Sequence, residues 1–161
     1  MSMKVLIIGG GFGGLFCARR LGGTDTEVTV LDQSAGHLFQ PLLYQCATGT
    51  LSIGHISRPL REEFAHHPNV TTLLGEAVAL DPDARRLTVM RPDETTFTAD
   101  YDVLVVAAGM QQSYFGKEHF AQWAPGMKTL DDALTIRQRV FTAFEIAETL
   151  PPGPERDAWL T

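Results

Sequence analysis

The chain of 161 residues contains 44% hydrophobic and 20% charged residues, proportions typical of one soluble globular domain with a sizeable core. Its net charge of −6 argues against general nucleic-acid binding, and its longest apolar stretch, residues 103–110, is too short to span a membrane. The N-terminus carries no signal-peptide pattern, and Cys17 and Cys46 have neither CxxC nor zinc-ligand spacing. We therefore expect a cytoplasmic location, two free thiols and no metal site.

The first elements in chain order are a strand, a helix and a second strand. Residues 5–8 form a continuous apolar run, typical of a strand buried in the centre of a parallel sheet. Residues 12–21 predict a helix that ends at Gly22-Gly23, and residues 28–31 predict a second strand. This order is that of a Rossmann-like α/β fold.

The turn between the first strand and the helix carries the pattern GxGxxG at Gly9, Gly11 and Gly14. Gly9 permits a tight turn, Gly11 lets the backbone approach a pyrophosphate, and Gly14 lets the helix pack closely on the sheet. The alternative is a glycine-rich turn with a purely structural role.

Three residues beside these glycines complete the candidate site. Phe12 and Gly13 open the helix, whose N-terminus offers N–H groups and a positive dipole end to phosphates. Asp32 ends the second strand, where a carboxylate can accept hydrogen bonds from ribose hydroxyls and would repel a 2′-phosphate. The purely structural alternative leaves Asp32 unexplained, so the pattern predicts a dinucleotide other than NADP.

The middle of the chain begins with a long apolar segment. We expect residues 34–58 to form an irregular loop that is functional or buried against another surface. Residues 59–64 predict a short helix, and residues 70–74 a third parallel strand.

The pattern then changes to short strands separated by turn residues, which predicts a three-stranded antiparallel meander over residues 77–80, 86–89 and 95–98. Residues 103–107 are again an apolar run typical of a buried strand, and they end at Ala108-Gly109.

The last predicted element is a helix over residues 130–150, with Thr129 as its N-cap and Asp132 as the partner in an approximate capping box. Residues 151–161 have a linker-like composition. We therefore expect a Rossmann-like binding domain over residues 1–150, which lacks the C-terminal segment that would complete it, and a tail over residues 151–161.

An antiparallel meander that interrupts a parallel sheet resembles the FAD domain of two-dinucleotide flavoproteins. Residues 101–109 resemble the second flavin fingerprint of those proteins, an apolar strand that ends in small residues. The resemblance favours FAD over NAD as the cofactor.

Three segments, residues 37–45 with 47–49, residues 111–116, and residues 124–129 with 131–133, resemble those of type II NADH dehydrogenases, and the likeness extends over residues 4–148. These are non-proton-pumping NADH:quinone oxidoreductases in which FAD accepts hydride from NADH and passes electrons to a membrane quinone. The resemblance implies this activity, and a peripheral position on the inner face of the cell membrane for the whole protein.

The same resemblance implies roles for further residues. It assigns the pyrophosphate turn to the three glycines and the ribose contact to Asp32. It adds the following residues, which would meet the adenine, the flavin or the surroundings of the flavin ring: Ala77, Val78, Ala108, Gly109, Gln40, Pro41 and Gln45.

The family also needs a second glycine turn for NADH and a C-terminal segment that returns to the FAD domain and supplies the quinone site. Neither is found in these residues. We therefore expect NADH and quinone to bind through regions outside this chain, and copies of the chain to associate over the uncovered face. Two alternatives stay open. One is another flavoprotein such as a sulfide:quinone reductase, in which Cys46 would be a redox thiol, and the other is a non-catalytic flavin-binding module.

Overall fold

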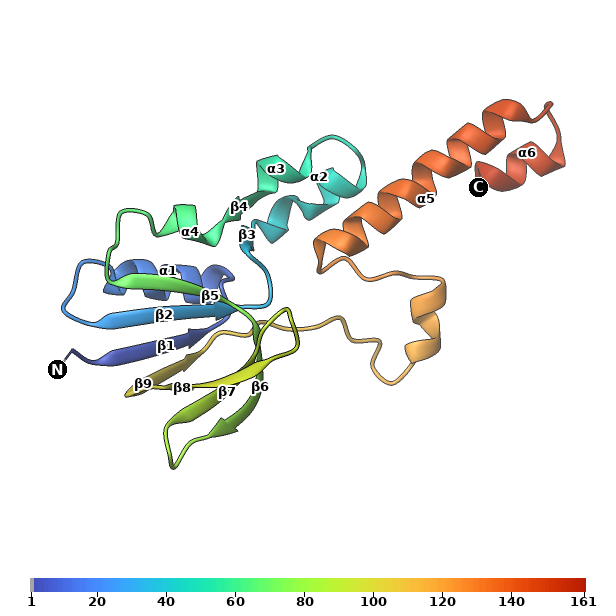
Figure 1. Ribbon diagram of the computed structural model, residues 1–161. Helices are drawn as coiled ribbons and strands as arrows, with labels where there is room; N and C mark the ends of the chain where they lie inside the picture. Colours follow the sequence, from blue (N-terminus) through green and yellow to red (C-terminus); the bar gives the residue numbers. More distant parts are fainter. Residues whose placement is uncertain (1) are drawn as a thin grey trace. The chain divides into compact units, whose positions relative to one another are not determined.

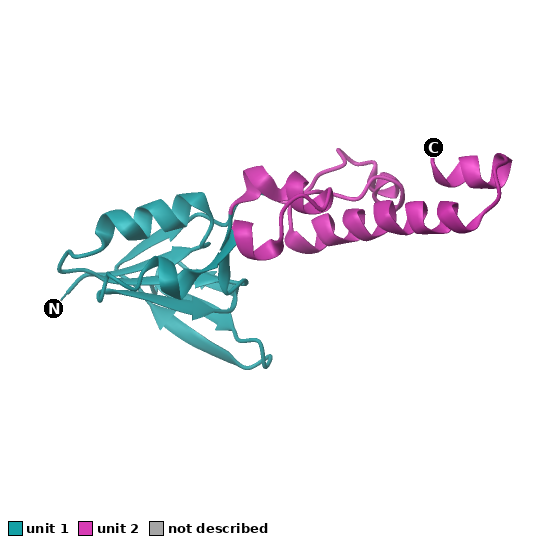
Figure 2. Ribbon diagram, turned by 90° about the horizontal axis from the view of Figure 1, so that it is seen from above, with its two compact units in different colours: residues 1–38, 57–110 teal, residues 39–56, 111–161 magenta. Residues whose placement is uncertain are grey.

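A parallel sheet of four strands organises the first of two units into which the chain divides (Figure 1; Figure 2). The computed structural model describes residues 2–161. Unit 1 contains residues 1–38 and 57–110, and unit 2 contains residues 39–56 and 111–161. The predicted α/β fold is confirmed in unit 1, where a parallel and an antiparallel sheet occur together.

The parallel sheet has the strand order β5-β2-β1-β9, and every neighbouring pair is parallel. Its strands are β1 (Lys4–Ile8), β2 (Glu27–Asp32), β5 (Val70–Leu74) and β9 (Val103–Val106). The connection from β1 to β2 is helix α1 (Phe12–Leu21), and the short helix α4 (Leu60–Glu63) precedes β5. The four strands and α1 were all predicted from the sequence.

Strand β1 contributes to two hydrophobic clusters, one on each face of the sheet. Val5 and Ile7 pack with residues of α1 and α4, whereas Leu6 packs with Leu87 and Val89 of the antiparallel sheet. A strand covered on both faces needs apolar side chains at every position, which explains its uninterrupted apolar run.

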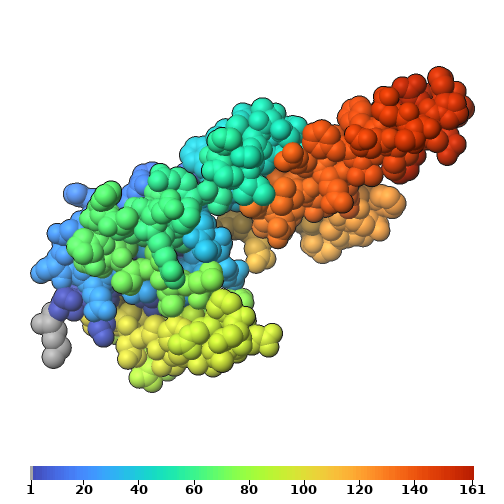
Figure 3. All heavy atoms as spheres, turned by 45° about the horizontal axis from the view of Figure 1, so that its top comes forward, coloured from blue at the N-terminus to red at the C-terminus, as the bar shows by residue number. Residues whose placement is uncertain are grey.

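The meander is also confirmed. Strands β6 (Glu76–Asp81), β7 (Arg86–Met90) and β8 (Thr96–Asp100) form an antiparallel sheet in that order. The pairing of β6 with β7 is irregular between Ala77 and Ala79. In the space-filling view, the atoms of the meander, yellow-green to yellow, form one continuous surface with the blue and green atoms of unit 1 (Figure 3).

The expectation of an irregular loop over residues 34–58 was wrong. This segment contains β3 (Gly36–Leu38), η1 (Gln40–Leu42), α2 (Leu43–Ala47), α3 (Ile53–Ile56) and β4 (Ser57–Pro59), and β3 pairs with β4 in an antiparallel ribbon. The physical reason is burial, because Leu43, Cys46 and Ile56 are almost fully inaccessible to solvent and pack as core residues.

Unit 2 is built around α5 (Leu130–Thr149), which packs against α2 and against α6 (Pro154–Trp159); η2 (Glu118–Gln122) precedes it. The predicted N-cap is confirmed, since Thr129 and Asp132 form a complete capping box. The composition of the tail suggested a linker, but α6 forms there because Pro154 is favourable in the first turn of a helix. Within residues 2–161, no helix is long and apolar enough to cross a bilayer.

Candidate dinucleotide-binding site

The turn from β1 into α1 depends on Gly9. Its φ of +104° lies in the region that side chains disfavour, and a Cβ at this position would overlap the carbonyl oxygen of Ala107. Its N–H donates to the carbonyl of Leu31 at 2.7 Å. Gly9 therefore makes the tight turn that the sequence predicted, and it does so in contact with both neighbouring chain segments.

Gly14 and Gly11 differ in their surroundings. A Cβ on Gly14 would overlap the carbonyl oxygen of Gly9 and would lie 3.2 Å from the side chain of Ile7, so this glycine allows the close packing of α1 on the sheet. A Cβ on Gly11 would meet no atom within 4 Å, and Gly11 is exposed at the N-cap of α1 with no side-chain cap. The main chain at Gly11 is therefore accessible to a ligand.

The sequence pattern did not single out Gly10, but both its main-chain N–H and its carbonyl are hydrogen-bonded to side chains. Its N–H donates to Oδ2 of Asp32 at 2.6 Å, and its carbonyl oxygen lies 2.9 Å from Nδ1 of His37. A Cβ here would collide with Leu60. A larger residue here would therefore require the Leu60 side chain to move, and the main chain of Gly10 is held by two side chains from other strands.

Asp32 supports the turn in addition to the role predicted for it. Its second oxygen, Oδ1, accepts the N–H of Ser34 at 2.6 Å. A carboxylate can accept about four hydrogen bonds, and the half-buried Asp32 side chain keeps acceptor capacity beyond these two. The arrangement suits a ribose beside the turn.

The small residues after β9 lie next to the same turn. The N–H of Ala107 donates to the carbonyl of Ile8 at 2.8 Å, and its own carbonyl faces Gly9. Ala108 and Gly109 follow at once, and Gly109 has a φ of +74° with open space around it. They are therefore at the carboxyl edge of the sheet, where open α/β sheets bind their ligands.

Ala77 and Val78 lie where the pairing of β6 with β7 is irregular. They closely follow Gly75, which is hydrogen-bonded to Asp32. The N–H of Gly75 donates to the main-chain carbonyl of Asp32 at 2.9 Å, which fixes the start of β6 beside the end of β2. Ala77 is half-buried against the core and Val78 is 46% exposed.

Gln40, Pro41 and Gln45 belong to unit 2, and the side-chain hydrogen bonds of the two glutamines are made within it. Nε2 of Gln40 donates to the carbonyl of Lys128 at 2.7 Å, and Nε2 of Gln45 donates to the hydroxyl of Tyr44 at 2.9 Å. Both amides therefore have hydrogen-bond partners within unit 2.

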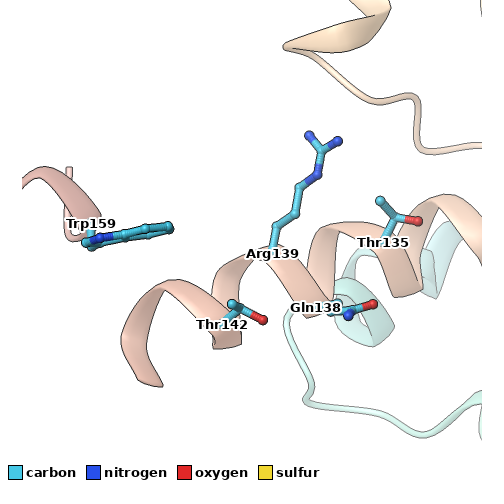
Figure 4. A pocket seen from close by; sticks show the side chains of 5 residues that line it. All are labelled: Thr135, Gln138, Arg139, Thr142 and Trp159. Carbon is cyan, nitrogen blue, oxygen red and sulfur yellow. The ribbon is translucent and has the colours of Figure 1, made fainter. Parts of the chain in front are cut away.

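Unit 2 also contains a pocket of about 430 Å³ that was not predicted. Figure 4 shows its lining side chains, which come from one stretch of α5 and from α6: Thr135, Gln138, Arg139, Thr142 and Trp159. It contains none of the predicted site residues.

The sequence model of the pyridine nucleotide-disulphide oxidoreductases matches residues 3–143. The chain belongs to this family. Proteins of this family are FAD-binding flavoproteins, and the turn fits such a ligand, since it combines an open backbone at Gly11 with a carboxylate at Asp32.

The chain is similar to two proteins of Mycobacterium tuberculosis. It is 51% identical to the type II NADH:quinone oxidoreductase NdhA and 47% identical to Ndh, in each case over 98% of this chain. It spans 33% and 34% of those proteins, about one third of their length.

Solved structures show the same fold. NDH2 from Plasmodium falciparum in complex with NADH matches 94% of this chain with a TM-score of 0.84 and 24% identity, and the match covers 31% of that chain. The sulfide:quinone oxidoreductase of Aquifex aeolicus matches 89% of this chain with a TM-score of 0.70 and 24% identity, covering 33% of its own chain.

Proposed function

We propose that these 161 residues are the FAD-binding part of a type II NADH:quinone oxidoreductase. The observation that supports this most directly is the glycine turn of β1 and α1 with Asp32 at the end of β2, in a chain 51% identical to NdhA. When bound, FAD supplies the redox chemistry, taking hydride from NADH and passing electrons to a quinone.

The protein's own residues would bind and orient the cofactor. Main-chain N–H groups at Gly11 and in the first turn of α1 would receive the pyrophosphate, and Asp32 would accept hydrogen bonds from ribose hydroxyls. Backbone at Ala77 and Val78 would meet the adenine. Gly109, which has open space and a left-handed backbone, would let the main chain approach the flavin.

Gln40, Pro41 and Gln45 are proposed to lie near the flavin ring, an assignment that rests on the family resemblance of their segment. NADH is proposed to bind to a part of the protein outside these 161 residues, because FAD and NADH each require a glycine-rich turn and the described chain has one. Quinone is also proposed to bind outside these residues, an assignment that rests on the family resemblance. The whole protein would then act at the cytoplasmic face of the membrane.

A sulfide:quinone-type role for Cys46 has no support in its surroundings. The thiol is 1% exposed, and its Sγ lies 3.6 Å from the carbonyl of Ser52. A redox thiol must meet its substrate, so a buried Cys46 is better explained as a packing residue of α2.

The visible absorption spectrum of the purified chain tests the proposal. After incubation with FAD and desalting, the chain should retain flavin absorption. An Asp32→Ala variant should lose most of it, whereas Asp25→Ala, which changes an exposed carboxylate in the α1–β2 turn, should retain it. A folded chain that is colourless after incubation with saturating FAD and desalting would contradict the proposal.

A further inference from the structure

His37 is a buried polar side chain, 8% exposed, that the proposed function does not use. Its Nδ1 lies 2.9 Å from the carbonyl oxygen of Gly10. A carbonyl can only accept a hydrogen bond, so Nδ1 carries the hydrogen and donates it. The ring is therefore bound to the middle of the glycine-rich turn.

The position of the ring is fixed from two sides. His37 lies on β3, where it is paired with Arg58 of β4 in the antiparallel ribbon. The ring of Phe12, the first residue of α1, meets it edge-on, with centroids 5.1 Å apart and an interplanar angle of 87°. His37 therefore connects the β3–β4 ribbon to both the turn and the start of the helix.

The turn needs such a connection because three glycines follow one another. Gly9, Gly10 and Gly11 have no side chains to restrict their dihedral angles, so a peptide plane between two of them can rotate at little steric cost. The carbonyl of Gly10 and the N–H of Gly11 belong to one planar peptide and point in opposite directions. A bond that fixes the carbonyl therefore fixes the direction of the N–H.

We propose that His37 is a positioning residue that orients the Gly10–Gly11 peptide, so that the N–H of Gly11 is directed away from the protein and toward the pyrophosphate of a bound dinucleotide. Asp32 holds the preceding N–H of Gly10, so the peptide chain is restrained on both sides of Gly10. Gly11 is exposed, with no atom within 4 Å of a Cβ built there. This inference rests on the proposed function, because it concerns the same ligand.

The test compares three variants of His37 in the 161-residue chain. The amide N–H of His37→Asn takes the place of Nδ1–H, whereas in His37→Gln the amide lies one bond farther out, and His37→Leu has no donor. The probes are ADP, which carries the pyrophosphate, and adenosine, which does not, each measured by isothermal titration calorimetry. His55→Leu is the control, since His55 bonds to Ser52 within unit 2.

We expect His37→Leu and His37→Gln to weaken ADP binding about five- to tenfold, the effect of one lost hydrogen bond, with adenosine affinity unchanged. His37→Asn and His55→Leu should bind ADP as the unmodified chain does. If His37→Leu fails to fold, the contrast between Asn and Gln decides the question.

Two results would overturn the positioning role: unchanged ADP affinity in all His37 variants, or equal losses for ADP and adenosine, which would indicate a general disturbance of the fold. Failure of the unmodified chain to bind either ADP or FAD would instead reject the proposed function, and the positioning role with it.

Discussion

The carbonyl oxygen of Gly9 lies directly against the Cα of Gly14, in the space that a Cβ would occupy. This contact joins the end of β1 to the first turn of α1. It means that the spacing of the two glycines is required for folding even before any ligand is present.

We expect Gly14→Ala to destabilise the chain by about 1–3 kcal/mol, because the added methyl group forces the helix away from the sheet. Gly13→Ala is the matched control in the same turn, since a Cβ there would lie an ordinary 3.5 Å from the Cβ of Ala107. Urea denaturation without cofactor measures both. Equal midpoints for the two variants would contradict the packing role of Gly14.

Gly11→Val should abolish the rise in melting temperature that FAD produces by binding the folded state. The valine side chain would occupy the open space in front of the turn, where the pyrophosphate is proposed to bind. Valine is a poor N-cap, so the variant without cofactor should lose only about 1 kcal/mol of stability. Differential scanning fluorimetry with and without FAD makes the comparison, and an unchanged FAD effect would exclude the turn as the binding site.

Stability at low pH should depend on Asp132. The N–H groups of Thr129 and then Lys128 donate to its carboxylate, and together with the Thr129 hydroxyl they hold the pKa of Asp132 below its ordinary value of 3.8, against a smaller opposing effect of burial. Since the folded pKa is the lower one, the stabilising contribution is complete above the ordinary value and is lost as the pH falls through the lowered value.

Asp132→Asn should therefore weaken α5 by about 1 kcal/mol at neutral pH, and the difference from the unmodified chain should vanish in acid. Circular dichroism at 222 nm, recorded during an acid titration, follows the helix. Asp131→Asn is the control, because Asp131 lies in the same first turn outside the capping box. A difference that persists in acid would show that the effect does not come from the carboxylate.

Glu63 and Asp100 should respond differently to neutralisation. Glu63 forms ion pairs with Arg19 and Arg58 and its side chain is 5% exposed, whereas the Asp100 side chain, paired with Arg86, is 66% exposed. Glu63→Gln should destabilise the chain by about 2 kcal/mol, and Asp100→Asn by less than about 1 kcal/mol. Guanidinium chloride would screen the ion pairs, so urea is the suitable denaturant, and similar losses would contradict this ranking.

The 161-residue chain should self-associate through the edge of its parallel sheet. Strand β9 is the last in the sheet order and carries Val103 and Val106, which are 42% and 67% exposed. An apolar sheet edge promotes pairing between chains, and a lysine there opposes it. Sedimentation velocity over a range of concentrations should show oligomers that Val106→Lys reduces, and a purely monomeric chain would refute the expectation.

The parts of the fold that could be predicted are those governed by neighbours in sequence. Gly9 and Gly14 have the tight surroundings that their spacing predicts, whereas a Cβ on Gly11 would meet no atom, so the approach of a pyrophosphate to Gly11 stays a prediction. Thr129 and Asp132 are likewise three residues apart and complete their capping box locally. The alternation of strands and turns predicted the meander for the same reason.

The remaining features depend on partners far along the chain. The bond from His37 to Gly10 joins residues 27 positions apart, and the ribbon that holds His37 requires β4, which follows two short helices. Nothing in the residues around His37 reveals that its ring will be buried. The helices α2 and α3 were missed because elements of five and four residues are too short to show a period.

Because the single strand β1 supplies side chains to both hydrophobic clusters, it joins them into one cooperative structure. Opening of the helical layer exposes Val5 and Ile7, and opening of the meander exposes Leu6, but either event alone leaves β1 hydrogen-bonded to β2 and β9. We therefore expect the main-chain amides of β1 to exchange with solvent more slowly than those of the edge strands β5 and β9, because neither of these openings separates β1 from its neighbours.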